Sequence, residues 1–105
     1  MTILENLLRM IDGPRDGALL RHAIGIELMK AGDPAGAALR FREAVDRDAN
    51  FSAGWKALGK ALAESGQPAE ALASYNRGIE VALARGDIQA AREMKVFARR
   101  LSKSD

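Results

Sequence analysis

The sequence predicts an all-α fold of about six antiparallel helices in a single domain, residues 1–105. Three observations predict it. Alanine is abundant, whereas the aromatic and β-branched residues typical of strands are scarce. A segment of about 34 residues occurs twice, and Gly and Pro interrupt the chain at short intervals. Folding of 105 residues buries somewhat more than half of the surface that the unfolded chain exposes, which is enough for one hydrophobic core.

The duplication appears when the chain is compared with itself at an offset of 34 residues. The aligned pairs share small, apolar or turn-forming character, and they are Ala23–Ala57, Ile24–Leu58, Gly25–Gly59, Leu28–Leu62, Gly32–Gly66, Pro34–Pro68, Ala35–Ala69, Ala37–Ala71 and Phe41–Tyr75. Chance seldom aligns two internal glycines, two Gly-x-Pro turns and an aromatic in one register. We therefore predict two copies of one unit, residues 18–51 and residues 52–85, stacked side by side.

A helix is predicted ahead of the two repeats, over residues 2–12. Thr2 and Glu5 have the spacing of a capping box, and Gly13-Pro14 ends the helix. Three of its apolar residues fall 34 positions before apolar residues of the first repeat: Ile3, Leu7 and Met10, before Ala37, Phe41 and Ala44. We expect this segment to be the second half of a degenerate preceding unit, which caps one end of the array.

Each repeat is predicted to contain two helices. In the first repeat, apolar residues recur at helical spacing at Leu20, Ala23, Ile24, Leu28 and Ala31. Gly32 ends this helix and Asp33 is a natural N-cap for the next one. Pro34 suits the first position of the second helix, which extends to about Asp48.

The second repeat has the same order of signals. Asn50 or Ser52 is expected to cap a helix that continues through Trp55 to Gly66. Gln67-Pro68 then opens a helix whose apolar residues are Ala71, Leu72, Tyr75, Ile79 and Leu83. Because the loops contain only two to four residues, consecutive helices are predicted to run antiparallel.

A last helix is predicted over residues 87–103. Gly86 ends the preceding helix and Asp87 is a new N-cap. The apolar residues of this helix are Ile88, Ala91, Met94, Phe97, Ala98 and Leu101, and they do not align with the repeat. Its cations are Arg92, Lys95, Arg99, Arg100 and Lys103, against the acid Glu93. Cations in the last turns of a helix complement its dipole, which is the interpretation we favour, with nucleic-acid binding as the alternative.

One spaced set of residues in each repeat matches a known motif. The second repeat meets the pattern W-x2-L-G-x2-Y followed by A-x3-F with Trp55, Leu58, Gly59, Ala71 and Tyr75, and has Leu62 in place of the tyrosine. The first repeat keeps the spacing with Ile24, Gly25, Leu28, Ala37, Phe41 and Ala44, but has Arg21 in place of the tryptophan. Ala49 and Leu83 replace the closing prolines. Residues 18–85 thus resemble the tetratricopeptide repeat family, which implies a short right-handed solenoid of helical hairpins with the last helix as a solubilising cap.

Two glycines inside predicted helices indicate close packing. Glycine in a helix interior costs about 1 kcal/mol relative to alanine, so Gly25 and Gly59 are expected to serve a packing need. Ala37 and Ala71 indicate small-residue contacts between the paired helices. We therefore predict that the backbone of each first helix is approached closely by its partner helix.

The chain offers little for catalysis or for metal binding. His22 is the single histidine, and cysteine is absent. The serines lie at helix edges or on polar faces without a nucleophile motif around them: Ser52, Ser65, Ser74, Ser102 and Ser104. Glu43, Asp46 and Asp48 lack the spacing of a calcium loop. We therefore expect a protein that is not an enzyme and that has no cofactor and no metal.

The N-terminus has neither a basic start nor a small-residue cleavage site, so it does not have the pattern of a secretory signal. No apolar run approaches the roughly 18 residues of a membrane span. We therefore expect a cytoplasmic protein without a membrane partner. The net charge of +2 is too small to indicate an anionic partner by itself.

The resemblance also implies a binding surface, because the first helices of tetratricopeptide repeats line a concave face. The corresponding positions are His22, Ile26, Met29, Lys30, Lys56, Lys60, Ala63 and Glu64. The spacing of His22, Ile26 and Met29 independently assigns them to one helical face. Such a face suits a short peptide with apolar and acidic groups. In the alternative interpretation, Ile26 and Met29 pack under the N-terminal helix and the lysines are simply solvated.

The predicted function is a protein-interaction module, or adaptor, that binds a peptide or a partner helix in this concave face. One alternative is a structural module whose apolar cap helices pair two copies into a homodimer. Nucleic-acid binding through the basic C-terminal helix is a weaker alternative, because that segment has only Phe97 as an aromatic and contains no nucleic-acid recognition motif. The identity of the partner protein is not encoded in any of these patterns.

Overall fold

The computed structural model describes residues 1–103, so Ser104 and Asp105 of the expected domain lie outside the described residues. The helices are α1 (Ile3–Leu8), α2 (Ala18–Lys30), α3 (Pro34–Arg47), α4 (Ser52–Glu64), α5 (Pro68–Ala84) and α6 (Ile88–Ser102). No strand occurs between residues 1 and 103. The predicted all-α fold of six helices is confirmed.

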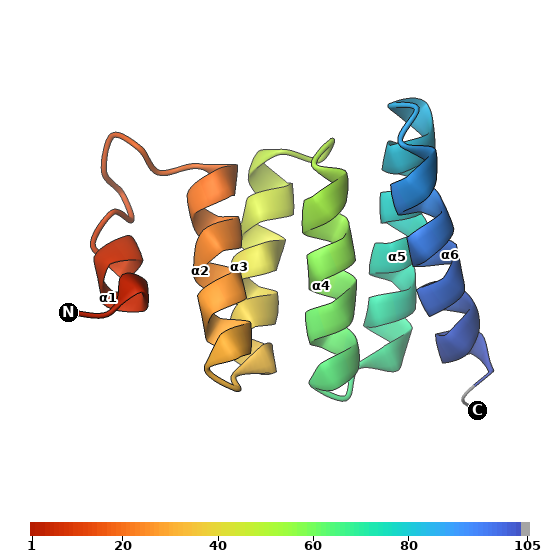
Figure 1. Cartoon of the computed structure of the whole chain (residues 1–105), viewed down its shortest axis with the longest axis horizontal. Helices are drawn as coiled ribbons and strands as arrows, with labels where there is room; N and C mark the ends of the chain where they lie inside the picture. The colour runs from red at the N-terminus through yellow and green to blue at the C-terminus, as the bar shows by residue number, and fades with distance from the viewer. Residues whose placement is uncertain (104–105) are drawn as a thin grey trace.

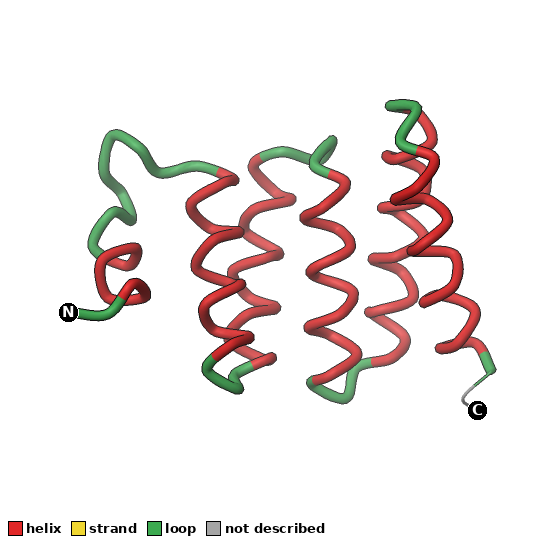
Figure 2. The backbone as a smooth tube through the Cα atoms, viewed as in Figure 1, coloured by secondary structure: helices red, strands yellow, loops and turns green. Residues whose placement is uncertain are grey.

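The helices form an elongated array in chain order, with α1 at one end and α6 at the other (Figure 1). The loops that join α2 to α6 alternate between the two ends of the helices, so these helices run antiparallel (Figure 2). Each of them packs on the next in sequence, and α1 packs on α2. In Figure 1, α2, α4 and α6 lie nearer the viewer than α3 and α5, which gives the array two layers.

The hydrophobic core runs along the array between these layers. Its largest fully buried side chains are Ile24 of α2, Phe41 and Val45 of α3, Leu58 of α4 and Met94 of α6. Complete burial of such a side chain stabilises the fold by roughly 1.5–3 kcal/mol. One cluster of buried residues joins α3, α4 and α5 and contains Phe41 and Leu58, and a second cluster joins α5 to α6 and contains Met94.

The predicted glycine stops and aspartate N-caps of the helices are confirmed. Gly32, Gly66 and Gly86 have φ values of 81°, 80° and 78°, a left-handed conformation that glycine adopts without strain. The side chains of Asp33 and Asp87 then accept hydrogen bonds from the backbone N–H groups of the following helices. The local sequence therefore specifies where each hairpin turns.

The two internal glycines of the repeats meet aromatic rings. A Cβ atom added to Gly25 would lie 2.5 Å from Cε1 of Phe41, and one added to Gly59 would lie 2.6 Å from Cε1 of Tyr75. Ala37 and Ala71 are completely buried in the paired helices. The expected close approach of the second helix to the first is confirmed in both hairpins.

Two details at helix ends were predicted wrongly. Helix α1 ends at Leu8, before the expected end of the helix over residues 2–12, although Thr2 and Glu5 form the predicted capping box. After Leu8 the backbone continues in tighter turns, in which the N–H groups of Met10 and Ile11 donate to the carbonyls of Leu7 and Leu8. The chain then turns at Asp12, which has φ 65° and donates its backbone N–H to the Asp16 carboxylate. Neither Asn50 nor Ser52 caps α4: its N-cap is Phe51, which makes no side-chain cap.

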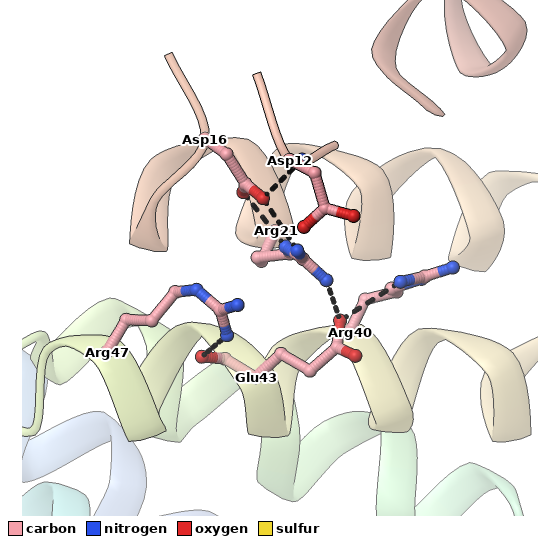
Figure 3. Close-up of polar contacts among 6 residues, drawn as sticks. All are labelled: Asp12, Asp16, Arg21, Arg40, Glu43 and Arg47. Atoms are coloured by element: carbon pink, nitrogen blue, oxygen red, sulfur yellow. Dashed lines mark hydrogen bonds and ion pairs between the residues drawn. The ribbon is translucent and has the colours of Figure 1, made fainter. Parts of the chain in front are cut away.

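A buried ion network joins the segment before α2 to the array (Figure 3). Arg21 is 5% exposed, and its guanidinium binds both oxygens of Asp16 at 2.6 and 3.0 Å and Glu43 of α3 at 3.0 Å. Arg40 also binds Glu43, at 3.1 Å. The hydrogen bonds from Arg21 hold the pKa of Asp16 well below its ordinary value. Arg21 therefore occupies the tryptophan position of the motif with a charged side chain whose charge is balanced by two carboxylates.

Helix α6 takes the place of the first helix of a third hairpin. The seventh residue of α2, α4 and α6 is Ile24, Leu58 and Met94, and each is completely buried. Helix α6 packs along α5 as α4 packs along α3. The comparison at 34 residues misses this relation because α5 has 17 residues whereas α3 has 14, and the loop after α5 is one residue shorter.

Candidate functional site

Two adjoining hollows lie along the face formed by α2, α4 and α6. The larger has a volume of about 550 Å³, and the smaller, of about 220 Å³, shares Ile26, Ala57 and Lys60 with it. We call the two together the groove. The residues expected at the concave face all line it: His22, Ile26, Lys56, Lys60, Ala63 and Glu64 in the larger hollow, and Ile26, Met29, Lys30 and Lys60 in the smaller one.

The groove exists because α4 carries small residues between two helices with larger ones. Ala53, Ala57 and Ala63 of α4 line its middle. Ile26 of α2 stands on one side and is 39% exposed, while Phe97 of α6 stands on the other. The wall is therefore mainly apolar, and charged groups lie around it, as in most ligand-binding pockets of proteins.

Ion pairs balance part of the positive charge around the groove. Lys56 pairs with Glu93 of α6 at 3.1 Å, and Lys30 pairs with Glu27 at 3.0 Å. Lys60 makes no ion pair or hydrogen bond with any residue in the described part of the chain. Of the lysines chosen for the concave face, only Lys60 is therefore without a counter-ion among the described residues.

His22 contributes an apolar surface more than a charge. Its ring centroid lies 4.8 Å from that of Phe51 and 5.2 Å from that of Phe41. Its Nδ1 atom is buried and has no hydrogen-bond partner among residues 1–103. Burial lowers the pKa of His22 below 6.5, because the charged imidazolium loses its hydration there. The ring is therefore neutral at pH 7.

Three residues that line the larger hollow from α5 and α6 were missed by the sequence interpretation: Tyr75, Glu93 and Phe97. The rings of Tyr75 and Phe97 lie 5.5 Å apart, which joins α5 to α6 at the edge of the groove. Burial, with a contribution from the charge of Glu64, raises the pKa of Tyr75, so its hydroxyl keeps its proton. Counted from the helix starts, Glu93 corresponds to Ala57 of α4, which also lines the groove. Phe97 corresponds to Ala61, which is completely buried, so the positions of the repeat indicate Glu93 but not Phe97.

Ile26 and Met29, for which packing under the N-terminal helix was the alternative interpretation, differ in their exposure. Met29 is partly buried and packs against the core cluster that contains Phe41 and Leu58. Ile26 lines both hollows and is 39% exposed, far more than a core isoleucine such as Ile24. Of the apolar side chains that α2 contributes to the groove, Ile26 is therefore the most exposed.

No helix among residues 1–103 has the length and apolar character needed to cross a lipid bilayer. In the same part of the chain, no three His, Cys, Asp or Glu side chains gather closely enough to hold a metal ion. The lining of the groove is suited to apolar contact beside a few charged groups.

Comparison with known proteins identifies relatives along the whole chain, although no family model matches it. The chain is 39% identical over 102 residues to the TPR repeat-containing protein PA0015 of Pseudomonas aeruginosa, and the aligned region covers 97% of each chain. The solution structure of protein BPP2914 from Bordetella parapertussis matches with a TM-score of 0.84 and 35% identity, over 100% of this chain and 91% of that one.

A tetratricopeptide repeat domain protein from Salinibacter ruber matches with a TM-score of 0.78 and 25% identity, over 88% of this chain and 92% of that one. Folds of this kind generally mediate protein–protein interactions through the extended surfaces that stacked hairpins create. The paired glycines and rings of the hairpins, the six-helix array and these relatives agree. The chain belongs to the tetratricopeptide repeat family.

Proposed function

We propose that the protein is an interaction module whose groove binds a peptide or a helix of another protein. The observation that carries this proposal is that all eight residues chosen from the sequence line two adjoining hollows on one face. The larger hollow, of about 550 Å³, has a volume typical of pockets that enclose a few side chains. We expect this binding to occur in the cytoplasm.

The lining specifies the chemistry of the bound segment. An apolar side chain of the partner would contact Ile26, Ala57 and Ala63 and exclude water from them. An acidic group beside it would pair with Lys60, which has no counter-ion among the described residues. Glu64 would repel a second acid nearby. The preferred ligand is therefore a segment with an apolar residue next to a single carboxylate.

Selection from a displayed library of random peptides tests this proposal, because the library samples every combination of side chains. We expect the selected peptides to combine apolar residues with an acid. Their affinity should fall about tenfold or more for Ile26→Glu and for Lys60→Glu. Ile26→Glu places a carboxylate against the apolar side chain of the peptide, and Lys60→Glu places one against its acidic group. Matched controls outside the groove are Leu39→Glu on α3, where the side chain is 59% exposed, and Arg9→Glu before α2.

The groove would lose its assigned role if no peptide were selected, or if the groove variants and the control variants bound the selected peptides equally. Affinity capture from native lysate with the wild type beside the Ile26→Glu, Lys60→Glu double variant would then identify the natural partner. Proteins retained by the wild type and lost from the double variant are the candidates.

Self-association is a second candidate function, favoured by exposed apolar side chains at the N-terminal end. Ile3, Leu8 and Leu19 are 65%, 39% and 76% exposed. Two copies could cover these side chains by pairing around α1. Light scattering should then detect a dimer at high micromolar concentration, and Leu19→Glu should dissociate it. A monomer throughout the concentration series would exclude this candidate.

A further inference from the structure

Helix α6 has a continuous positive face. Five of the chain's 16 Lys and Arg residues lie on this helix or at its C-cap. Residues three, four or seven positions apart lie on one side of a helix. The exposed residues that share such a side form what we call the basic face: Ile88, Arg92, Lys95, Val96, Arg99 and Lys103.

The cations of the basic face are not neutralised by the described part of the chain. No hydrogen bond or ion pair joins the side chains of Arg92, Lys95, Arg99 or Lys103 to another residue between 1 and 103. Elsewhere ion pairs are frequent, and they involve Arg21, Lys30, Arg40, Arg42, Lys56 and Arg77. Helix α6 and its C-cap thus gather four cations that have no ion pair within the described part of the chain.

The helix dipole does not explain this arrangement. A cation near the C-terminus of a helix is stabilised by the dipole, but the effect is confined to the last turn. That accounts for Arg99 and Lys103, whereas Arg92 and Lys95 lie in the first half and the middle of α6. Like charges three or four residues apart also repel each other. An anionic group bound along α6 would remove this repulsion.

The position of the basic face indicates what kind of group binds there. In α2 and α4 the eighth residue is glycine, and a ring from the following helix lies against it. The eighth residue of α6 is Lys95, and no following helix covers it in the described chain. We propose that the basic face binds an acidic helix of a partner protein, which packs along the exposed side of α6 and contacts Lys95 at the position where α2 and α4 contact the second helix of their hairpins.

The composition of the basic face favours a protein helix over other anionic partners. Ile88 and Val96 are 48% and 40% exposed among the cations, so the partner needs apolar groups as well as carboxylates. The ring of Phe97 lies against Tyr75, so it does not provide a free stacking surface for a base. The main apolar face of α6 is buried on α5, so α6 cannot insert into a bilayer.

The partner helix therefore has a definable pattern. The rise of an α-helix is about 1.5 Å per residue, so the four cations extend over roughly 16 Å, or three helical turns. Acidic residues every three or four positions would pair with them, and small apolar residues between those acids would contact Val96 and Ile88. This surface is separate from the groove and does not depend on its function.

Fluorescence anisotropy with defined probes tests the proposal. The main probe is a labelled helical peptide of about 20 residues, long enough to form a helix, with Glu four residues apart and Ala or Leu between. The comparison probes are the same peptide with Gln for Glu, a single-stranded RNA, and vesicles of phosphatidylcholine with phosphatidylserine. We expect binding of the Glu peptide in preference to all three, with an affinity that falls as salt is added.

Charge reversal locates the binding surface. The Lys95→Glu, Arg99→Glu variant should bind the Glu peptide at least about tenfold more weakly. The control variant Arg9→Glu, Arg15→Glu has the same change in net charge at exposed positions near the other end, and it should bind as the wild type does. Circular dichroism should give equal helix content for both variants. A peptide with Lys in place of Glu should bind the Lys95→Glu, Arg99→Glu variant better than it binds the wild type.

Several outcomes would overturn the proposal. One is the absence of Glu-peptide binding, and another is equal weakening by the control variant. Preference for RNA would indicate a nucleic-acid surface, and preference for the vesicles would indicate a membrane surface. If Lys60→Glu abolished binding of the Glu peptide while the Lys95→Glu, Arg99→Glu variant retained it, the peptide would occupy the groove instead of the basic face.

Discussion

Replacement of Gly59 by alanine should destabilise the protein, although alanine is the better helix former. In an exposed helix the exchange would stabilise by about 1 kcal/mol. Here the added methyl group would lie 2.6–2.8 Å from three ring atoms of Tyr75, which is 4% exposed and packed in the core. Insertion of atoms into a packed core costs roughly 1–3 kcal/mol, and these short distances indicate the upper part of that range. The expected net loss is therefore about 1–2 kcal/mol.

A double-mutant cycle separates the clash from the helix preference. In a Tyr75→Ala background the ring is gone, so Gly59→Ala should stabilise by about 1 kcal/mol. The sign of the effect therefore reverses between the two backgrounds, with a coupling energy of roughly 2–3 kcal/mol. The free energy of unfolding is measured by urea denaturation monitored with Trp55 fluorescence and, independently, by circular dichroism.

The first hairpin provides an internal repetition of this experiment. Gly25 lies against Phe41 as Gly59 lies against Tyr75, with the nearest distance 2.5 Å. Gly25→Ala should therefore show the same sign reversal with Phe41→Ala. If either glycine variant were more stable than the wild type with the ring present, the ring would not be what requires glycine at these positions, and the packing argument would be refuted.

Three further predictions concern the turns and the titrating groups. Gly66→Ala should lower the free energy of unfolding by about 1 kcal/mol because the residue has φ 80°, and Gly66→Asn should lower it less. Arg21 lowers the pKa of Asp16 below 3.8, so below about pH 4 the unfolded chain takes up a proton at Asp16 before the folded chain does. The stability of the fold should therefore fall below about pH 4. Thermal unfolding should show a smaller fall in the Asp16→Asn variant. Burial lowers the pKa of His22 below 6.5, so the stability of the fold should also fall as the pH drops through 6.5. A proton NMR titration of the single imidazole should show the lowered pKa directly.

Local signals in the sequence were sufficient to predict most helix boundaries. Gly32 and Gly66, each followed two residues later by proline, determine the turn conformation through interactions between near neighbours. The end of α1 was missed because the backbone changes to tighter turns after Leu8, and no Gly or Pro marks that change in the sequence before Gly13. Burial of Arg21 could not be predicted either, since it requires Glu43 from another helix.

The groove was predicted on one side better than on the other. The face of α2 follows from helical periodicity and the family resemblance, so Ile26 could be chosen from the sequence. Phe97 could not, because the corresponding residue of α4 is Ala61, which is completely buried, so the repeat does not mark that position as part of a binding face. Glu93 corresponds to Ala57, which was not among the residues chosen from the sequence. The pair Lys56–Glu93, which reduces the positive charge of the groove, joins residues 37 positions apart and is a property of the tertiary fold.

The eighth residue of α2, α4 and α6 connects the packing of the hairpins with the chemistry of the exposed side of α6. At Gly25 and Gly59 the absence of a side chain allows a ring of the next helix to lie against the backbone. Lys95 stands at the corresponding place in α6, so a helix that carried an aromatic ring there would meet a charged side chain. Burial of that ammonium group without a counter-ion would cost more than the apolar contact gains. A helix that packs on α6 over Lys95 therefore needs a carboxylate at the position where the second helices of the hairpins have Phe41 and Tyr75. An acidic helix should bind there, and a copy of either hairpin should not.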